Sequence, residues 1–218
     1  MIKKLIHTVL NFIFPQKCLG CKKENPPVGG ICPECFSKID YPSFIKIGNV
    51  YAATDYNDDI IRKSVWQLKY KGRKEIAEPL SELIFQRLES KAIGNDWLII
   101  PVPLHKNRMK ERGFNQSELI AQKFFTKVKP SEIQTSGCLT NVLYKIKETP
   151  TQVSVKNREL RLKNLENAFE VRNADLIRDK KIILIDDIST TGATMRECIK
   201  TLKAGGAKKA IGFVVARG

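Results

Sequence analysis

The segment Ile182–Thr194 reads IILIDDISTTGAT and predicts the junction between a buried strand and a helix. Four aliphatic residues lead into two adjacent carboxylates, Asp186 and Asp187, and a turn rich in hydroxyl side chains then opens a helical segment at Ala193–Ala204. A continuous aliphatic run is typical of a strand buried on both faces of a parallel sheet. Ligands bind such sheets at the carboxyl ends of the strands, so we expect a ligand site here.

The two carboxylates and the turn that follows them suit different parts of one ligand. A helix N-terminus preceded by glycine and threonine offers backbone N–H groups, hydroxyl donors and the positive end of the helix dipole, which together bind phosphate. The carboxylates would repel phosphate, so they suit neutral hydroxyls such as those of ribose. A ribose 5′-phosphate satisfies both. The alternative is that Asp186 or Asp187 only caps the helix, which explains one acid but not two beside this turn.

Strand and helix patterns alternate over residues 50–218. The expected strands are Val50–Thr54, Trp97–Val102, Leu139–Ile146, Ala168–Val171, Ile182–Ile185 and Ala210–Ala216. The expected helices are Ile60–Leu68, Ile76–Leu88, Asn115–Phe125 and Ala193–Ala204. This alternation indicates an α/β fold in which helices cover both faces of a mainly parallel sheet.

Cys18, Cys21, Cys32 and Cys35 form two CxxC motifs within eighteen residues. This spacing fits four thiolate ligands around one zinc ion better than a pair of redox motifs, which is the alternative. Four sulfur ligands leave no open position for a substrate, so we expect a structural Zn²⁺ whose binding supplies folding free energy of order ~10 kcal/mol to residues 15–48. Free thiols also imply a reducing compartment, and we expect a cytoplasmic protein.

Residues 1–14 carry an apolar stripe at helical spacing. Its members are Ile2, Leu5, Ile6, Val9, Leu10, Ile13 and Phe14. Polar residues interrupt the run and no small-residue cleavage site follows it, so the segment is not a signal peptide, and it is too short to span a bilayer. We expect an amphipathic helix that docks on the chain's own core, on a partner helix, or peripherally on the inner membrane surface.

The chain has 218 residues and a strongly basic charge balance. Lys and Arg number 38 against 23 Asp and Glu, a formal charge of +15. With 42% apolar and 28% charged residues the chain can bury a core, which excludes disordered, collagen-like and multi-pass membrane classes. Polyanions such as nucleic acid, phosphorylated metabolites and acidic membranes are the first partners to consider. Most of the excess charge belongs to residues 51–218.

The chain as a whole resembles the ComF/ComFC competence-protein family, which joins an N-terminal zinc ribbon to a type I phosphoribosyltransferase domain. The resemblance rests on Cys18–Cys35, Leu68–Arg73, Pro101–Pro103, Arg112–Gln116, Thr149–Gln152, Arg158–Asn164 and Asp186–Thr194. It implies a zinc ribbon over residues 15–48. Over residues 50–218 it implies a type I phosphoribosyltransferase fold, with a twisted, mainly parallel sheet and flanking helices.

The resemblance also assigns a ligand, phosphoribosyl pyrophosphate. Asp186 and Asp187 would hold its ribose hydroxyls. The turn would cradle its 5′-phosphate through Ser189, Thr190, Thr191, Gly192, Ala193 and Thr194. Mg²⁺ would accompany the ligand, because Mg²⁺ prefers substrate phosphates and waters to many protein carboxylates. The sequence assigns neither a catalytic residue nor an acceptor nucleophile.

The residues after Pro103 suit the diphosphate of this ligand. They form a loop at the end of a strand, and from Lys106 to Arg112 four basic residues face one acid, Glu111. Lys, Arg and backbone N–H groups are what diphosphate capture requires, although an ordinary solvated basic loop is the alternative. The expected diphosphate residues are Leu104, His105, Lys106, Asn107 and Arg108, of which we expect His105 to be a turn or hydrogen-bonding residue rather than a base.

A polar stretch follows Tyr144. In related transferases a flexible loop in this region closes over the bound substrate and excludes water, which protects an oxocarbenium-like intermediate from hydrolysis. The resemblance places that loop at Thr149, Pro150, Thr151 and Gln152. Arg158, Arg161 and Asn164 either belong to the loop or brace it against the sheet.

Two functions remain open at this stage. The resemblance implies a role in natural transformation, with phosphoribosyl pyrophosphate bound and incoming single-stranded DNA handled beside a competence helicase or DNA-processing partner. The alternative is a metabolic phosphoribosyltransferase with an unidentified acceptor and no DNA role. The DNA candidates are Trp66, Lys69, Tyr70, Lys71 and Arg73, a mixture able to stack bases and neutralise phosphates. Trp66 is equally well explained as a core anchor.

Overall fold

The computed structural model describes most of the chain. The described residues are 16–24, 26, 29–40, 45–89, 96–128, 135–149 and 165–218. The expected amphipathic helix in residues 1–14 lies outside them. So do the loop residues Pro150, Thr151 and Gln152, together with Arg158, Arg161 and Asn164.

A six-stranded sheet forms the centre of the molecule. Its strands, in spatial order, are β1 (Ile45–Ile47), β2 (Val50–Asp55), β8 (Lys209–Arg217), β7 (Lys181–Ser189), β3 (Trp97–Pro101) and β4 (Thr135–Cys138). β1 is antiparallel to β2, and the remaining neighbours are parallel. The mainly parallel sheet expected from the apolar runs is therefore confirmed.

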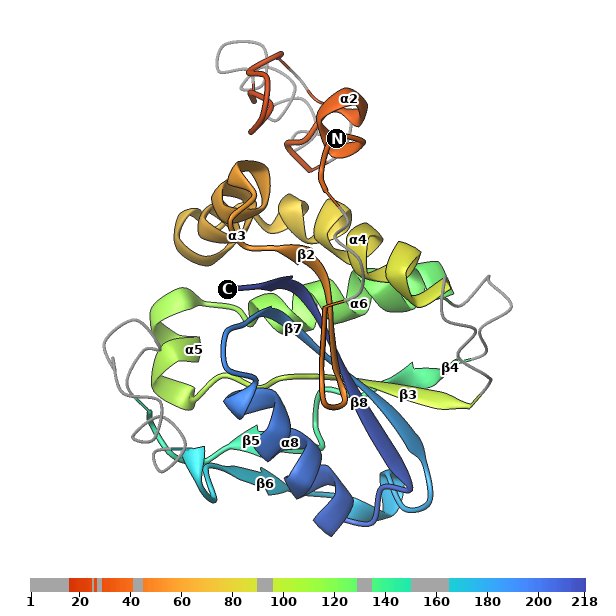
Figure 1. Ribbon diagram of the computed structural model, residues 1–218. Coiled ribbons are helices and arrows are strands. Elements are labelled where there is room, and N and C mark those ends of the chain that lie inside the picture. Colours follow the sequence, from red (N-terminus) through yellow and green to blue (C-terminus); the bar gives the residue numbers. More distant parts are fainter. Residues whose placement is uncertain are drawn as a thin grey trace, which may run out of the picture.

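Helices cover both faces of this sheet (Figure 1). The elements on one face are α3 (Asp59–Lys71), η1 (Lys74–Ile76), α4 (Ala77–Glu89) and α6 (Gln116–Val128). The other face carries α8 (Ala193–Ala204), the short helix η2 (Ala174–Leu176) and a two-stranded ribbon of β5 (Leu143–Lys145) and β6 (Phe169–Val171). Side chains of β7 alternate between the two layers: Ile183 and Ile185 join the first, and Ile182 and Leu184 join the second.

Helix α3 shows how local sequence fixes these elements. Asp58 caps its start, since the side chain accepts hydrogen bonds from the backbone N–H groups of Ile60 at 2.8 Å and Ile61 at 3.0 Å. The apolar face of the helix is buried in the first core layer. Gly72 ends the helix in the left-handed conformation with φ of 66°, which glycine adopts without strain. The last turn, Lys69–Lys71, therefore sits at a defined place above the sheet.

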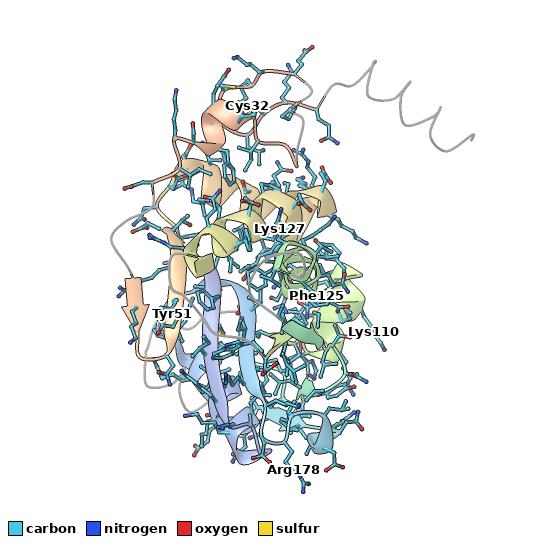
Figure 2. The ribbon with its side chains drawn as sticks, turned by 90° about the vertical axis from the view of Figure 1, so that its right-hand side faces the viewer. Cys32, Tyr51, Lys110, Phe125, Lys127 and Arg178 are labelled. Atoms are coloured by element: carbon cyan, nitrogen blue, oxygen red, sulfur yellow. The ribbon has the colours of Figure 1, made fainter. Side chains whose placement is uncertain are left out.

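The cysteine module, by which we mean the described residues between 16 and 40, contains the short helix α2 (Pro33–Phe36) and packs on α3 and α4. Figure 2 shows Cys32 at one end of the molecule and Arg178 at the other. The approach is close: a Cβ on Gly29 would lie 2.4 Å from Cδ of Pro79. Arg73 adds a hydrogen bond of 2.8 Å from Nη2 to Oε1 of Gln16. The module is thus part of the first core layer.

Four elements differ from the sequence-based expectation. β1 falls within the range expected for the zinc ribbon, yet it pairs with β2. The expected strand Leu139–Ile146 shortens to β5, which joins β6 in the ribbon, and β4 precedes it with the weakly apolar sequence TSGC. β4 is held by pairing with β3 rather than by its own hydrophobic pattern. The fourth element, α5 (Lys106–Arg112), replaces most of the expected loop.

None of the described helices is long and apolar enough to cross a bilayer. Those of thirteen residues, such as α3, extend about 20 Å at 1.5 Å per residue, against a hydrocarbon core of roughly 30 Å.

Candidate functional site

Asp186 and Asp187 lie near the carboxyl end of β7, and both are buried. Oδ1 of Asp186 accepts hydrogen bonds from the Ser117 hydroxyl at 2.6 Å and from the backbone N–H of Asp187 at 2.9 Å. Oδ2 of Asp187 lies 2.7 Å from Nζ of Lys69, and its Oδ1 accepts from the N–H of Ile188 at 2.7 Å. Neither carboxylate caps α8, so the helix-cap alternative is wrong.

The electrostatics of this pair are set by burial and by the Lys69 ammonium. Burial, followed by the neighbouring charge of Asp187, raises the pKa of Asp186 to about 7. Burial alone would lower the pKa of Lys69, but the charge and hydrogen bond of Asp187 and the charge of Asp186 together outweigh burial and hold that pKa above its ordinary value. Lys69 therefore remains an ammonium at neutral pH. The site presents two carboxyl groups and one internal cation, an arrangement suited to neutral hydroxyls rather than to phosphate.

The turn after β7 leads directly into α8. Gly192 is the N-cap of α8 and adopts φ of 73°, and a Cβ there would lie 2.9 Å from Nη1 of Arg196. The same Nη1 donates a hydrogen bond of 2.7 Å to the carbonyl of Thr191, and the Thr191 hydroxyl accepts from the N–H of Ala193 at 3.3 Å. The turn is thus braced at the positive end of a twelve-residue helix, as a phosphate site requires.

The expected diphosphate segment begins beside this turn. β3 pairs with β7, and the N–H of Val102 donates to the carbonyl of Ile185 at 2.9 Å, so both chains leave the sheet at the same edge. The expectation of a loop over Leu104–Arg108 is wrong beyond His105, because α5 begins at Lys106. Nδ1 of His105 accepts from the N–H of Asn107 at 3.4 Å and caps the helix, which confirms its hydrogen-bonding role.

A cavity of about 390 Å³ lies between this segment and the β5–β6 ribbon. Its lining residues are Leu104, His105, Lys106, Met109, Tyr144, Lys145, Ile146 and Arg172. Three of them, Lys106, Lys145 and Arg172, carry amine or guanidine groups, and none of the lining residues is acidic. The cavity therefore suits an anion.

The five DNA candidates divide into two groups. Trp66 and Tyr70 are 45% and 63% exposed, so Trp66 is not a core anchor. Nζ of Lys71 lies 5.2 Å from the Trp66 ring centroid. Lys69 and Arg73 point elsewhere, Lys69 to Asp187 and Arg73 to Glu75 and the cysteine module.

Arg112 extends the exposed group, with Cζ 5.6 Å from the Tyr70 ring centroid, and the centroids of Trp66 and Tyr70 are 6.1 Å apart. We call Lys71, Trp66, Tyr70 and Arg112 the aromatic ladder. Two neighbouring rings with a cation at each end can stack bases and neutralise phosphates.

The four expected zinc ligands come together. The Sγ atoms of Cys18, Cys21, Cys32 and Cys35 all lie within 4.8 Å of one another, and those of Cys21 and Cys32 are 3.6 Å apart. Tetrahedral zinc with Zn–S bonds of about 2.3 Å needs sulfur atoms roughly 3.8 Å apart. The cluster fits a single structural zinc ion, and one cluster of four disfavours the alternative of two separate redox pairs.

Comparison with known protein families agrees with both halves of this structure. Residues 9–46 match the double zinc ribbon domain, and residues 110–218, half of the chain, match the phosphoribosyl transferase domain. Among similar proteins are competence protein F of Haemophilus influenzae, 25% identical over 88% of this chain and 86% of that protein, and competence protein ComFC of Bacillus subtilis, 28% identical over 67% and 55%. The chain belongs to the ComF family.

A third ComF-like relative carries a different name. The DNA utilization protein YhgH of Salmonella typhi is 28% identical over 206 residues, which cover 87% of this chain and 85% of that protein. The type I phosphoribosyltransferase fold with an N-terminal zinc ribbon, expected from the sequence, is confirmed.

Sequence reasoning missed several site residues of this ComF-family chain. Ser117 was assigned no role, although it lies three and four residues before Ile120 and Ala121 on the buried face of α6. A hydroxyl on an otherwise apolar helix face indicates a buried hydrogen-bond partner, which here is Asp186. Arg196 gave no such signal, because a basic residue in a surface helix is ordinary.

Proposed function

We propose that this protein binds phosphoribosyl pyrophosphate at the ends of β3 and β7 and handles incoming single-stranded DNA during natural transformation. The supporting observation for the ligand is the juxtaposition of the paired carboxylates with the turn that opens α8. Asp186 is oriented by Ser117, and Asp187 by Lys69, before any ligand arrives. Such preorganisation lowers the cost of binding a ribose in one pose.

Each part of the ligand has a matching part of the site. The ribose hydroxyls donate to Asp186 and Asp187, the 5′-phosphate accepts from the turn at Thr190–Thr194, and the diphosphate extends toward His105 and Lys106. Mg²⁺ reduces the charge of the diphosphate when it is bound with the ligand. Among the described residues, the carboxylates at the end of β7 are Asp186 and Asp187, and both are engaged by protein donors. The site therefore suits a Mg²⁺ that would be held chiefly by ligand oxygens and water.

Ligand binding is tested by calorimetry with phosphoribosyl pyrophosphate and Mg²⁺. We expect the variant Asp186→Asn with Asp187→Asn to lose binding while it keeps its zinc and its circular dichroism spectrum. The matched control is Asp175→Asn. Asp175 is an exposed acid on η2 that pairs with Arg178. Unchanged binding by the double variant would refute the site.

The aromatic ladder supports the DNA part of the proposal, together with relatives that are named for competence and DNA utilization. We expect single-stranded DNA to bind with an affinity that falls steeply with salt, by a slope of about 0.7 per phosphate neutralised. Replacing Lys71 and Arg112 by Gln lowers that slope, and Trp66→Ala with Tyr70→Ala weakens binding at every salt concentration. Leu176→Ala, at an equally exposed apolar residue far along the chain, is the control. A flat salt response contradicts the DNA role.

The intact carboxylate pair also favours a second candidate, a phosphoribosyltransferase with an unidentified acceptor and no DNA role. Mass spectrometry after incubation with phosphoribosyl pyrophosphate, Mg²⁺ and candidate acceptors separates the two. Ribose phosphate transferred to a small acceptor, with no DNA affinity, supports the metabolic enzyme. DNA binding without transfer supports the transformation role.

A further inference from the structure

Lys145 is a half-buried cation that neither the carboxylate pair nor the turn accounts for. It is the last residue of β5, and its side chain lies over the Phe169 ring with Nζ 5.8 Å from the centroid. Nζ donates a hydrogen bond of 2.7 Å to the hydroxyl of Thr149. None of the ion pairs formed by the described residues includes Lys145. A half-buried ammonium whose partner is a neutral hydroxyl lacks a counter-charge, and a bound anion would supply one.

The position of Lys145 connects the two ends of the candidate site. Its backbone forms a parallel bridge with His105, and it lines the cavity together with Lys106 and Arg172. Its side chain is near enough to interact electrostatically with Asp186 of β7 and Arg108 of α5. Lys145 therefore lies beside the segment expected to hold diphosphate and within electrostatic reach of Asp186.

Among the described groups around Lys145, none forms an ion pair that would neutralise its ammonium. Burial lowers the pKa of Lys145 below its ordinary value, and the charge of Arg108 adds to that shift, while Asp186 and Glu148 oppose it. Glu148 is engaged elsewhere, since its Oε2 accepts from Nδ2 of Asn107 at 2.6 Å. Cys198 of α8 also faces Lys145, but burial raises the pKa of its thiol well above the ordinary value, so the thiol is uncharged at neutral pH.

We propose that Lys145 is a further binding residue of the site, which takes the diphosphate group of the ligand as an ammonium. This inference rests on the proposed function. A diphosphate bound between His105 and Asp186 supplies a negative counter-charge for the Lys145 ammonium. Lys145 in turn donates a charge-assisted hydrogen bond to the diphosphate. Burial lowers the pKa of Lys145 and a bound anion raises it, so we expect binding in alkaline solution to be accompanied by proton uptake.

The test is calorimetry with two probes, phosphoribosyl pyrophosphate with Mg²⁺ and ribose 5-phosphate, which lacks the diphosphate. We expect Lys145→Met to lose roughly 10- to 100-fold in affinity for the first probe and nothing for the second. Lys147→Met is the matched control, since Lys147 is exposed and donates only to the carbonyl of Glu166 among described groups. Lys145→Arg, which keeps the charge, retains most of the affinity.

Proton uptake gives an independent readout. Binding heats measured at about pH 9 in buffers of different ionisation enthalpy report protons taken up. We expect the wild-type protein to take up more protons with phosphoribosyl pyrophosphate than Lys145→Arg does, because arginine does not deprotonate.

Equal affinity of Lys145→Met and wild type for phosphoribosyl pyrophosphate would overturn the inference, and so would an equal loss for both probes. Unchanged proton uptake by Lys145→Arg would also overturn it. If wild type binds neither probe, the proposed function itself fails and the inference falls with it.

Discussion

Nζ of Lys69, from the last turn of α3, lies 2.7 Å from Oδ2 of Asp187 on β7. A residue of the first helical layer thus reaches the carboxyl end of a central strand and neutralises one of its two carboxylates. We expect Lys69→Met to lower the free energy of unfolding by about 3 kcal/mol at pH 7, because it leaves Asp187 buried and unpaired. Urea denaturation measures this.

A double-mutant cycle separates that pair from general packing. Lys69→Met combined with Asp187→Asn removes both charges, so we expect the double variant to lose less stability than the two single variants added together. Additive losses would show that the two groups do not interact.

The pKa of Asp186 predicts an unusual pH dependence of stability. Its folded-state pKa, about 7, lies above the ordinary value of 3.8, so the folded protein holds a proton that the unfolded chain has released. Between about pH 4 and pH 7 this group therefore makes stability fall as pH rises, and its contribution is fully favourable only below pH 4. Asp186→Asn should remove this decline, which denaturation at pH 5 and pH 8 can measure. A parallel decline in wild type and variant would assign the effect to another group.

Removal of zinc should loosen α3 before it affects α8. The cysteine module holds α3 near its start, where a Cβ on Gly20 would lie 3.1 Å from Cδ1 of Ile60, and holds the turn beyond its end through Arg73 and Gln16. We expect chelation to speed amide hydrogen exchange in α3 and to lower the affinity for phosphoribosyl pyrophosphate through displaced Lys69. Added zinc should reverse both effects. Equal acceleration in α3 and α8 would indicate global unfolding instead.

Gly192→Ala should weaken binding of the 5′-phosphate for two reasons. Alanine is strained at the left-handed φ of this position, and its Cβ would collide with the Arg196 guanidinium. Gly48→Ala is the matched control, with φ of 59° and no atom within 4 Å of the new Cβ. Both variants should lose about 1–2 kcal/mol of stability from backbone strain. Only Gly192→Ala should also lose affinity for ribose 5-phosphate, by roughly tenfold, as calorimetry can show. Equal affinities of the two variants would exclude this role for the turn.

The sequence predicted the central elements because their signals are local. Continuous aliphatic runs identify β3, β7 and β8, and the CxxC spacing identifies the sulfur cluster. The residues Asp186 and Asp187 were found because two acids after a buried strand are uncommon.

The misassigned residues depend on contacts between distant segments. Lys69 lies among exposed basic residues in the sequence, and only the direction of α3 across the sheet turns its ammonium toward Asp187. Ser117 meets Asp186 across 69 positions of the chain. β4 has little apolar character, and it is a strand because its backbone pairs with the free edge of β3. No periodic pattern reports such long-range pairing.

The place of β8 in the sheet has a consequence for biosynthesis. β8 is the last described strand in chain order, yet within the described sheet it lies between β2 and β7 and pairs the half β1–β2 with the half β7–β3–β4. Until it leaves the ribosome, β2 and β7 each present an unpaired parallel edge. A nascent chain that stalls before Lys209 would leave both edges exposed, and unpaired strand edges are prone to pair with other chains.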